Sequence, residues 1–244
     1  MIFKSTSLLR RVWQAWRNHS PIAFCRIGAA YCLNAVLWRS PLAPRLKRRR
    51  LRIMEKLLGH RFDQPGLRLL EIGCGFGQDF AAHVAGAAQI EVYGIDTVNR
   101  GAHGVPSLRF VLADAEFIPF PDGFFDVVVS VGVLEHIQPI EKLCRVLTEC
   151  RRVGRAFVHV VPSLATPIEP HTAGLFWQLR RPGRKLPADD LNFFSDDAWL
   201  KFDGLDGARL ERFFYLPPLI SNLIIYRRFA TETDHPTISV LKSI

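Results

Sequence analysis

The sequence predicts an α/β fold in which a doubly wound parallel sheet follows an N-terminal helical extension. Short runs of branched apolar residues recur from residue 67 onward, and each is long enough for one buried strand. The first five runs are separated by segments of crossover length, which parallel neighbours require. A glycine-rich turn directly follows the first run, which places a ligand-binding corner at the carboxyl ends of the strands.

Charge sets the N-terminal segment apart. Residues 1–61 hold 14 Lys and Arg residues against one acid, Glu55. Residues 5–19 and 21–38 predict two helices, divided at Pro21. Tryptophans beside arginines suit a membrane interface, while packing on the rest of the chain as a lid or dimer surface is an equal alternative. A central arginine, Arg26, argues against a transmembrane span in the second helix, and an Arg-rich amphipathic N-terminus leaves a transit peptide open.

Residues 45–52 form a basic run that leads into an apolar stretch at residues 53–58, a pattern typical of a helix with a solvated face. Such a run also fits an anionic lipid surface, a phosphate-bearing substrate or nucleic acid. We rank nucleic acid last, because no RNA-binding module or aromatic stacking pattern accompanies the charge.

The first strand, residues 67–72, ends in a turn with glycine at positions 73, 75 and 77, and residues 78–88 predict a helix. A dinucleotide fingerprint requires glycine where Gln78 stands, and no Gly-Lys-Ser/Thr ending marks a phosphate loop. Glu71 would repel a pyrophosphate, but it could accept a hydrogen bond from a ligand ammonium or from the amides of the turn. Both features favour S-adenosylmethionine (SAM) over NAD.

Residues 71–77 resemble the first motif of the class I SAM-dependent methyltransferases. The resemblance implies a Rossmann-like, mostly parallel sheet of seven strands, closed by an antiparallel last strand, with SAM as cofactor. It also implies that the cofactor contacts the residues of this motif, which are Glu71, Gly73, Cys74, Gly75 and Gly77. The side chain of Cys74 reads most simply as a small group that fits.

The next two strands each end in an acid. Residues 90–95 lead to Asp96, whose carboxylate could accept hydrogen bonds from both ribose hydroxyls, with Thr97 beside it. The alternative for Asp96 is a turn-forming or helix-capping role. Residues 108–113 lead to Asp114 and Ala115, and the resemblance implies that this acid accepts from the adenine amine while a backbone amide donates to a ring nitrogen.

Residues 125–131 predict a central strand buried on both faces. Together with residues 132–137 they resemble the family's fourth-strand motif, which makes Ser130 and Val131 cofactor contacts. For His136 we favour a hydrogen-bonding role in the loop over a catalytic role, and we keep the second as an alternative.

The remaining elements complete the sheet. We expect a helix at residues 140–152, strands at 156–161, 208–216 and 237–241, and insertions at 163–200 and 217–229. The last strand is the antiparallel one that the resemblance implies. The predicted domains are a basic helical extension, residues 1–61, and a methyltransferase domain, residues 62–244, whose substrate-side insertion is residues 163–200.

Methyl transfer is an in-line displacement in which a hydroxyl acceptor benefits from a base. His171 is the best candidate, because Glu169 could orient it and Trp177 could exclude solvent. The alternative is a loop histidine bonded to backbone. His159 lies inside a strand and reads as a core residue. Short stretches around His171 and residues 191–195 are similar to methyltransferases of bacterial surface-glycan and glycolipid synthesis.

The predicted function is a SAM-dependent methyltransferase (EC 2.1.1.-) acting on a small-molecule, glycan or lipid-linked acceptor, at a hydroxyl. The alternatives are a SAM-binding scaffold without catalysis and a protein or RNA methyltransferase that docks through its basic arm. Five cysteines without a CxxC pair predict reduced thiols and no metal site. We expect a cytoplasmic protein that contacts the inner face of an anionic membrane peripherally through residues 1–52, of open oligomeric state.

Overall fold

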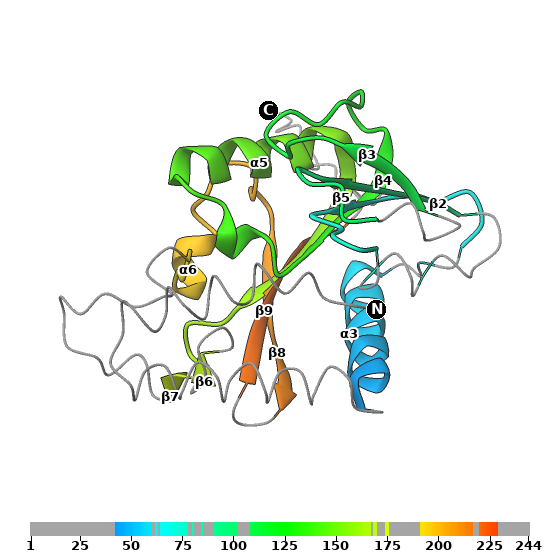
Figure 1. Cartoon of the computed structure of the whole chain (residues 1–244). Helices are drawn as coiled ribbons and strands as arrows, with labels where there is room; N and C mark the ends of the chain where they lie inside the picture. Colours follow the sequence, from blue (N-terminus) through cyan, green and yellow to red (C-terminus); the bar gives the residue numbers. More distant parts are fainter. Residues whose placement is uncertain are drawn as a thin grey trace, which may run out of the picture.

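The computed structural model describes residues 42–59, 62, 64–77, 80, 84, 90–101, 108–166, 168–169, 174–175, 191–216 and 220–228. In Figure 1 a twisted sheet runs through this part of the chain, with helix α3 on one side and helices α5 and α6 on the other. Two groups of buried apolar residues, one on each face of the sheet, form the core. The predicted helices at residues 5–19 and 21–38 lie outside the described residues. Of the predicted helix at residues 78–88 only Phe80 and Val84 are described, and the amide of Val84 donates to Phe80 O (3.3 Å).

The sheet has seven strands in the order β3-β2-β1-β4-β5-β9-β8. Strands β1 to β5 pair in parallel, whereas β9 is antiparallel to both of its neighbours, β5 and β8. The mostly parallel, seven-stranded sheet is therefore confirmed. The strands of the sheet are β1 (Arg68–Ile72), β2 (Glu91–Asp96), β3 (Leu108–Leu112), β4 (Phe125–Val131), β5 (Gly154–Pro162), β8 (Arg209–Leu216) and β9 (Ile220–Arg227).

Strand β4 shows why these residues form a parallel sheet. Val127 and Val129 are fully buried on the face covered by α3, and Val128 is fully buried on the face covered by α5. A strand with apolar side chains on both faces is stable only in the centre of a covered sheet, which is where β4 lies, between β1 and β5.

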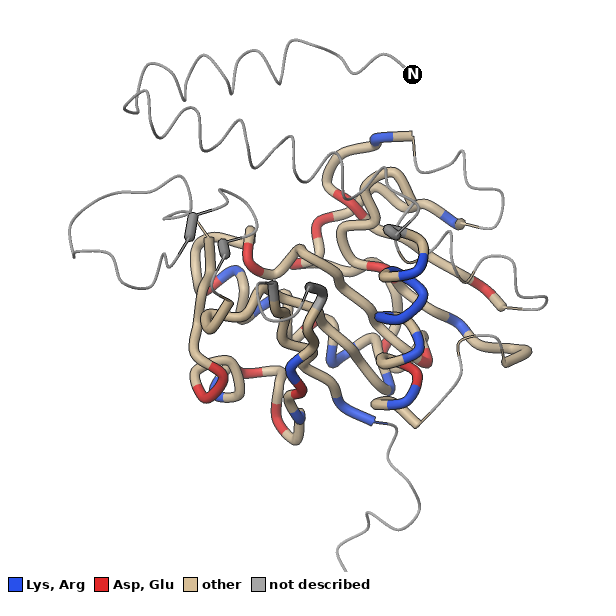
Figure 2. The backbone as a smooth tube through the Cα atoms, turned by 90° about the horizontal axis from the view of Figure 1, so that it is seen from below, with Lys and Arg blue, Asp and Glu red and all other residues tan. Residues whose placement is uncertain are grey.

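Helix α3 (Leu42–Leu58) divides its two faces between core and solvent. Met54 and Leu58 are buried against the sheet, and the helix contacts β5 and β9. The opposite face exposes four basic residues at helical spacing, Arg45, Arg48, Arg52 and Lys56. Figure 2 shows Lys and Arg recurring along this helix. None of the described helices combines the length and the apolar character that a membrane span requires.

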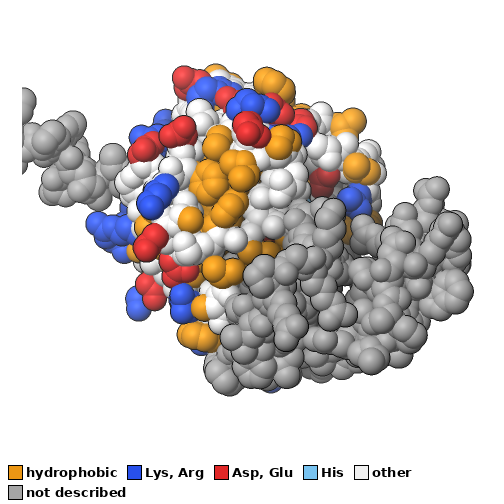
Figure 3. All heavy atoms as spheres, turned by 90° about the vertical axis from the view of Figure 1, so that its left-hand side faces the viewer, with side chains coloured by type: hydrophobic (Ala, Val, Ile, Leu, Met, Phe, Trp, Pro, Cys, Tyr) orange, Lys and Arg blue, Asp and Glu red, His pale blue; other side chains and the backbone are white. Residues whose placement is uncertain are grey.

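The other face of the sheet is covered by α5 (Ile140–Val153), close to the predicted 140–152, and by the short α6 (Asp196–Trp199). Trp199 is fully buried, and the Ser195 side chain caps α6 by accepting a hydrogen bond from the amide of Ala198. Figure 3 views this side of the molecule and shows a patch of apolar side chains among charged ones.

Where the structure describes the insertion predicted at residues 163–200, it contains two short strands besides α6. Strand β6 (Ile168–Glu169) pairs antiparallel with β7 (Gly174–Leu175) outside the main sheet. The start of this segment is tied to β9, because the amide of Ser163 donates to the carbonyl of Ser221 (3.1 Å) and the amide of Ser221 donates to Thr166 Oγ1 (3.2 Å).

The prediction of a second insertion at residues 217–229 is wrong. Strand β9 occupies Ile220–Arg227, where Leu223, Ile224 and Ile225 are fully buried between β5 and β8. The two prolines at 217 and 218 precede the strand and do not extend into it. Strand β9 is thus the antiparallel strand of the described sheet, and the strand predicted at residues 237–241 lies outside the described residues.

Replacement of Ile224 by Ala tests this assignment. The side chain is fully buried in the core below α3, so its truncation is expected to lower the free energy of unfolding by about 2–5 kcal/mol. The control is Glu211, an exposed residue of β8 that pairs with Ile224. Glu211→Ala should change the free energy of unfolding by less than about 0.5 kcal/mol. Chemical denaturation measures both, and equal small effects would contradict a buried β9.

Candidate active site

The glycine turn after β1 folds back onto the end of β2. The amides of Gly73 and Cys74 both donate to the carbonyl of Ile95, at 2.8 and 3.1 Å, and the amide of Gly77 donates to Cys74 O at 2.7 Å. Gly73, Gly75 and Gly77 all have positive φ, at 65°, 55° and 68°. A Cβ at Gly73 would lie 2.6 Å from Val133 Cγ2, so the turn also packs tightly against the loop after β4.

Gly75 is different, because no described residue other than its two chain neighbours has an atom within 4 Å of the position that its Cβ would occupy. Its backbone therefore borders open space at the carboxyl edge of the sheet. A ligand could lie against bare backbone there, which is the geometry that a nucleoside cofactor needs and that a larger residue would obstruct.

Glu71 is buried, with 3% of its surface exposed, and its Oε1 accepts a hydrogen bond from the amide of Phe80 (3.2 Å). The carboxylate thus holds the backbone that follows the turn. Cys74 is also buried, and burial, followed by the nearby charges of Glu71 and Asp96, raises the pKa of its thiol to about 12. Cys74 is therefore a neutral packing group at physiological pH, as expected.

Asp96 joins the turn to the end of β2. Its Oδ2 accepts from the amide of Gly75 (3.0 Å), and its Oδ1 accepts from the amide of Val98 (3.0 Å). Each carboxylate oxygen can accept a second hydrogen bond, so this arrangement supports the turn and leaves capacity for ribose hydroxyls. Thr97 is exposed beside it.

Asp114 has a partner that the sequence did not indicate. Lys142, in the first turn of α5, lies 2.5 Å from Asp114 Oδ2, and the amide of Glu116 donates to Oδ1 (3.1 Å). Partial burial opposes ionisation, but the hydrogen bonds from Lys142 and Glu116 lower the pKa of Asp114. The carboxylate is held as an anion beside Ala115, at the corner where adenine is expected. Nothing local in the sequence links Asp114 to a lysine 28 residues away.

Ser130 points into the core. It pairs in register with His159 on β5, and its Oγ lies 2.9 Å from His159 Nδ1. Both side chains are fully buried, so only the backbone of Ser130 can face a ligand, beside the half-buried Val131 at the end of β4. His159 is confirmed as a core residue, and burial lowers its pKa to about 3, which keeps the ring neutral.

Of the two candidate catalytic histidines, the structure describes His136 but not His171. His136 is exposed at the end of a short 3-10 helix, η2 (Leu134–His136), and its amide donates to Val133 O (2.9 Å). His171 and Trp177 lie outside the described residues. In the part of the chain that the structure describes, no three His, Cys, Asp or Glu side chains converge in a way that could hold a metal ion.

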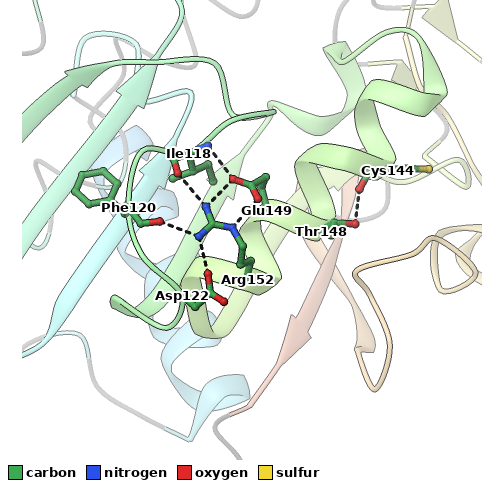
Figure 4. Close-up of polar contacts among 7 residues, drawn as sticks. All are labelled: Ile118, Phe120, Asp122, Cys144, Thr148, Glu149 and Arg152. Carbon is green, nitrogen blue, oxygen red and sulfur yellow. Dashed lines mark hydrogen bonds and ion pairs between the residues drawn. The ribbon is translucent and has the colours of Figure 1, made fainter.

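Arg152 is a second residue that sequence analysis missed. It bonds both oxygens of Glu149 (2.6 and 2.7 Å), Asp122 Oδ1 (2.8 Å) and the carbonyls of Phe120 (2.8 Å) and Ile118 (3.0 Å). Figure 4 shows this cluster, in which the end of α5 holds the segment that runs from the Asp114 corner to β4. The hydrogen bonds from Arg152 lower the pKa of Glu149, so the pair is ionised.

The family model described as "Methyltransferase domain" matches residues 40–201, which is more than half of the chain. The chain belongs to this family. The class I methyltransferase assignment is thus confirmed, and with it SAM as the cofactor that the sequence predicted. The glycine turn, open at Gly75, and Asp96 beside it fit that cofactor.

Three relatives of this methyltransferase domain are named after different methyl acceptors. An ajmaline N-methyltransferase of Rauvolfia serpentina is 30% identical over 48% of this chain and 43% of its own length. A fatty-acid O-methyltransferase of Mycolicibacterium smegmatis is 37% identical over 38% of this chain and 35% of its own length. A phthiotriol/phenolphthiotriol dimycocerosates methyltransferase of Mycobacterium ulcerans is 28% identical over 75% of this chain and 69% of its own length. The matched stretch spans less than half the length of the first two.

Solved structures support the fold. A 1,6-didemethyltoxoflavin-N1-methyltransferase of Burkholderia thailandensis, crystallised with 1,6-didemethyltoxoflavin and S-adenosylhomocysteine (SAH), superposes with a TM-score of 0.54 at 15% identity and covers 85% of this chain and 89% of its own. A SAM-dependent methyltransferase of Methanosarcina mazei gives a TM-score of 0.51 at 14% identity, over 69% and 95%. At these identities the likeness concerns the fold alone.

Gly75→Ala tests the open side of the turn, and Gly123→Ala is its matched control. Both glycines have positive φ (55° and 62°) and no atom within 4 Å of the added Cβ, so both variants should lose about 1–2 kcal/mol of stability. Gly123 lies before β4 begins, at the other edge of the sheet. Only Gly75→Ala should weaken SAH binding, by about tenfold or more in calorimetry. Equal affinities for the two variants would contradict this placement.

The buried His159 predicts a pH dependence of stability. Its native pKa of about 3 is below the unfolded value of about 6.5, so the unfolded chain takes up a proton that the folded chain cannot. Stability should fall as pH decreases below about 6.5, by up to about 1.4 kcal/mol per pH unit from this residue. Denaturation between about pH 5 and 7 should show a shallower slope for His159→Gln than for the exposed control His136→Gln. Identical slopes would contradict a neutral buried ring.

Proposed function

We propose that this methyltransferase domain transfers the methyl group of SAM to a hydroxyl of a lipid or glycan acceptor. The observation that carries the proposal is the open backbone at Gly75 with Asp96 bonded to it, because it offers a nucleoside both a cradle and a carboxylate. The names of the fatty-acid and phthiotriol relatives favour a lipid acceptor.

The proposed cofactor contacts follow the carboxyl edge of the sheet. Backbone of the Glu71 to Gly77 turn lies against the amino-acid part of the cofactor, and Asp96, with Thr97, accepts from the ribose. Asp114 and Ala115 face the adenine, and the backbone of Ser130 and Val131 closes the site at β4. Of these, the Asp114 carboxylate acts together with Lys142, which holds its orientation.

When bound, the cofactor supplies an electrophilic methyl group on a positively charged sulfur. The chain supplies orientation and a water-excluded cavity, since the charge disperses as the methyl group moves. His171 is the proposed base that takes the hydroxyl proton as the new C–O bond forms, with Glu169 as its orienting group. His136 is the alternative.

Transfer from tritiated SAM to dispersed long-chain alcohols, long-chain fatty acids and glycolipids tests the function. The proposal predicts label in a hydroxyl-bearing acceptor, and a single-turnover rate for His171→Ala that is lower by about 10²-fold or more, at unchanged SAH affinity. Label in the carboxylates alone would contradict a hydroxyl acceptor. SAH binding without transfer to any member would favour a non-catalytic scaffold.

We also propose that the basic face of α3 contacts an anionic membrane surface. Arg45, Arg48, Arg52 and Lys56 are exposed on one face of a helix that is anchored in the core. No acidic partner for these four is found among the described residues. A fixed row of cations suits phosphate headgroups, and each is worth about 1 kcal/mol at an anionic surface.

A flotation assay with vesicles containing phosphatidylserine tests this contact. Because α3 contributes to the core, charge replacement is more informative than deletion. Arg48→Gln with Arg52→Gln should weaken vesicle binding by about 2 kcal/mol, or about 30-fold, and the loss should shrink at high salt. Lys201→Gln with Arg209→Gln removes two exposed charges elsewhere and should bind as the wild type does. Equal losses would contradict a specific role for α3.

A further inference from the structure

Asn192 bonds one loop through its backbone amide and through both polar atoms of its side chain. Its amide donates to Glu135 O (2.7 Å), and its side-chain Nδ2 donates to the carbonyls of Leu134 (3.1 Å) and Ile137 (2.6 Å). Its side-chain Oδ1 accepts from Gln138 Nε2 (2.7 Å). Asn192 itself is buried, with 3% of its surface exposed.

Only a primary amide fits this position. Nδ2 donates to two backbone carbonyls at the end of η2, Ile137 O and Leu134 O, the second of which also accepts from the amide of Ile137. At the same time Oδ1 accepts from Gln138 Nε2, so the amide uses both its donor and its acceptor. An aspartate would present oxygen to two carbonyl oxygens. A leucine of similar size would remove all three side-chain hydrogen bonds to the loop, and only Leu134 O would keep a second donor, the amide of Ile137.

The loop that Asn192 holds lies directly against the glycine turn. It begins at Gly132, whose amide donates to Val160 O (2.9 Å), and continues with Val133. Val133 closes the space over Gly73, since a Cβ there would lie 2.6 Å from Val133 Cγ2. A shift of residues 132–138 would therefore move Val133 and change the wall of the turn.

We propose that Asn192 is a positioning residue that holds residues 132–138 against the glycine turn. It thereby fixes the wall of the site between the cofactor and the acceptor-side segment to which Asn192 belongs. The proposal rests on the proposed function for its consequence in methyl transfer. It does not assign Asn192 any contact with cofactor or acceptor.

The test compares Asn192→Leu with Leu205→Ala, a buried residue in the apolar cluster on the α5 side of the sheet, which also includes Leu134. The backbone amide of Leu205 donates to Phe202 O, so truncation of its side chain makes a cavity in this cluster and leaves the hydrogen bonds of Asn192 in place. Both variants are expected to lower the melting temperature. Three quantities are measured well below both melting temperatures: hydrogen–deuterium exchange, SAH affinity, and the single-turnover rate of transfer to whichever member of the acceptor panel is labelled.

Asn192→Leu should speed exchange in residues 132–138 at least tenfold, weaken SAH binding about fivefold and slow transfer at saturating SAM at least tenfold. Leu205→Ala should leave all three near wild type.

Gln138→Ala keeps the test decisive if Asn192→Leu does not fold. The side chain of Gln138 is exposed and gives only one of the bonds to Asn192, so a two- to fivefold loss of transfer rate is expected. Wild-type exchange and transfer in Asn192→Leu and in Gln138→Ala, or equal losses in Leu205→Ala, would overturn the proposal. A wild type that fails to bind SAH would instead refute the proposed function, and loop exchange would still test the role of Asn192.

Discussion

The candidate site depends on one constraint, the attachment of the glycine turn to the end of β2. Ile95 O receives the amides of Gly73 and Cys74, and Asp96 receives the amide of Gly75. These bonds are possible only because the turn adopts positive φ and β1 and β2 pair in parallel register. The turn is thereby fixed at the edge where the strands end, with its backbone open on one side.

The loops of the same edge are each held by a residue from a distant part of the chain. Lys142 bonds Asp114 after β3, and Asn192 bonds the loop after β4. Arg152, at the end of α5, bonds residues 118–122, which lead from the Asp114 corner to the other edge of the sheet. The strands position the backbone, and polar side chains from α5 and from residues 191–195 hold the loops between the strands. Such contacts reduce the reorganisation that ligand binding would require at the candidate site.

The sequence predicted the local features well. Strands β1 to β5, the glycine turn and α5 each depend on a short run of residues whose pattern is set by burial or by φ. The tertiary pairs could not be predicted, because Lys142 and Asn192 are ordinary polar residues until the fold brings them to Asp114 and η2. Strand β9 was missed because two prolines precede it and a buried antiparallel strand lacks the polar alternation that marks an exposed one.

A crystal structure of the full chain with SAH would show where the cofactor binds. We expect the nucleoside to lie across the ends of β1 and β2, with the backbone at Gly75 in van der Waals contact and both ribose hydroxyls within hydrogen-bond distance of the Asp96 carboxylate. A nucleoside bound elsewhere, or one whose ribose turns away from Asp96, would contradict this expectation.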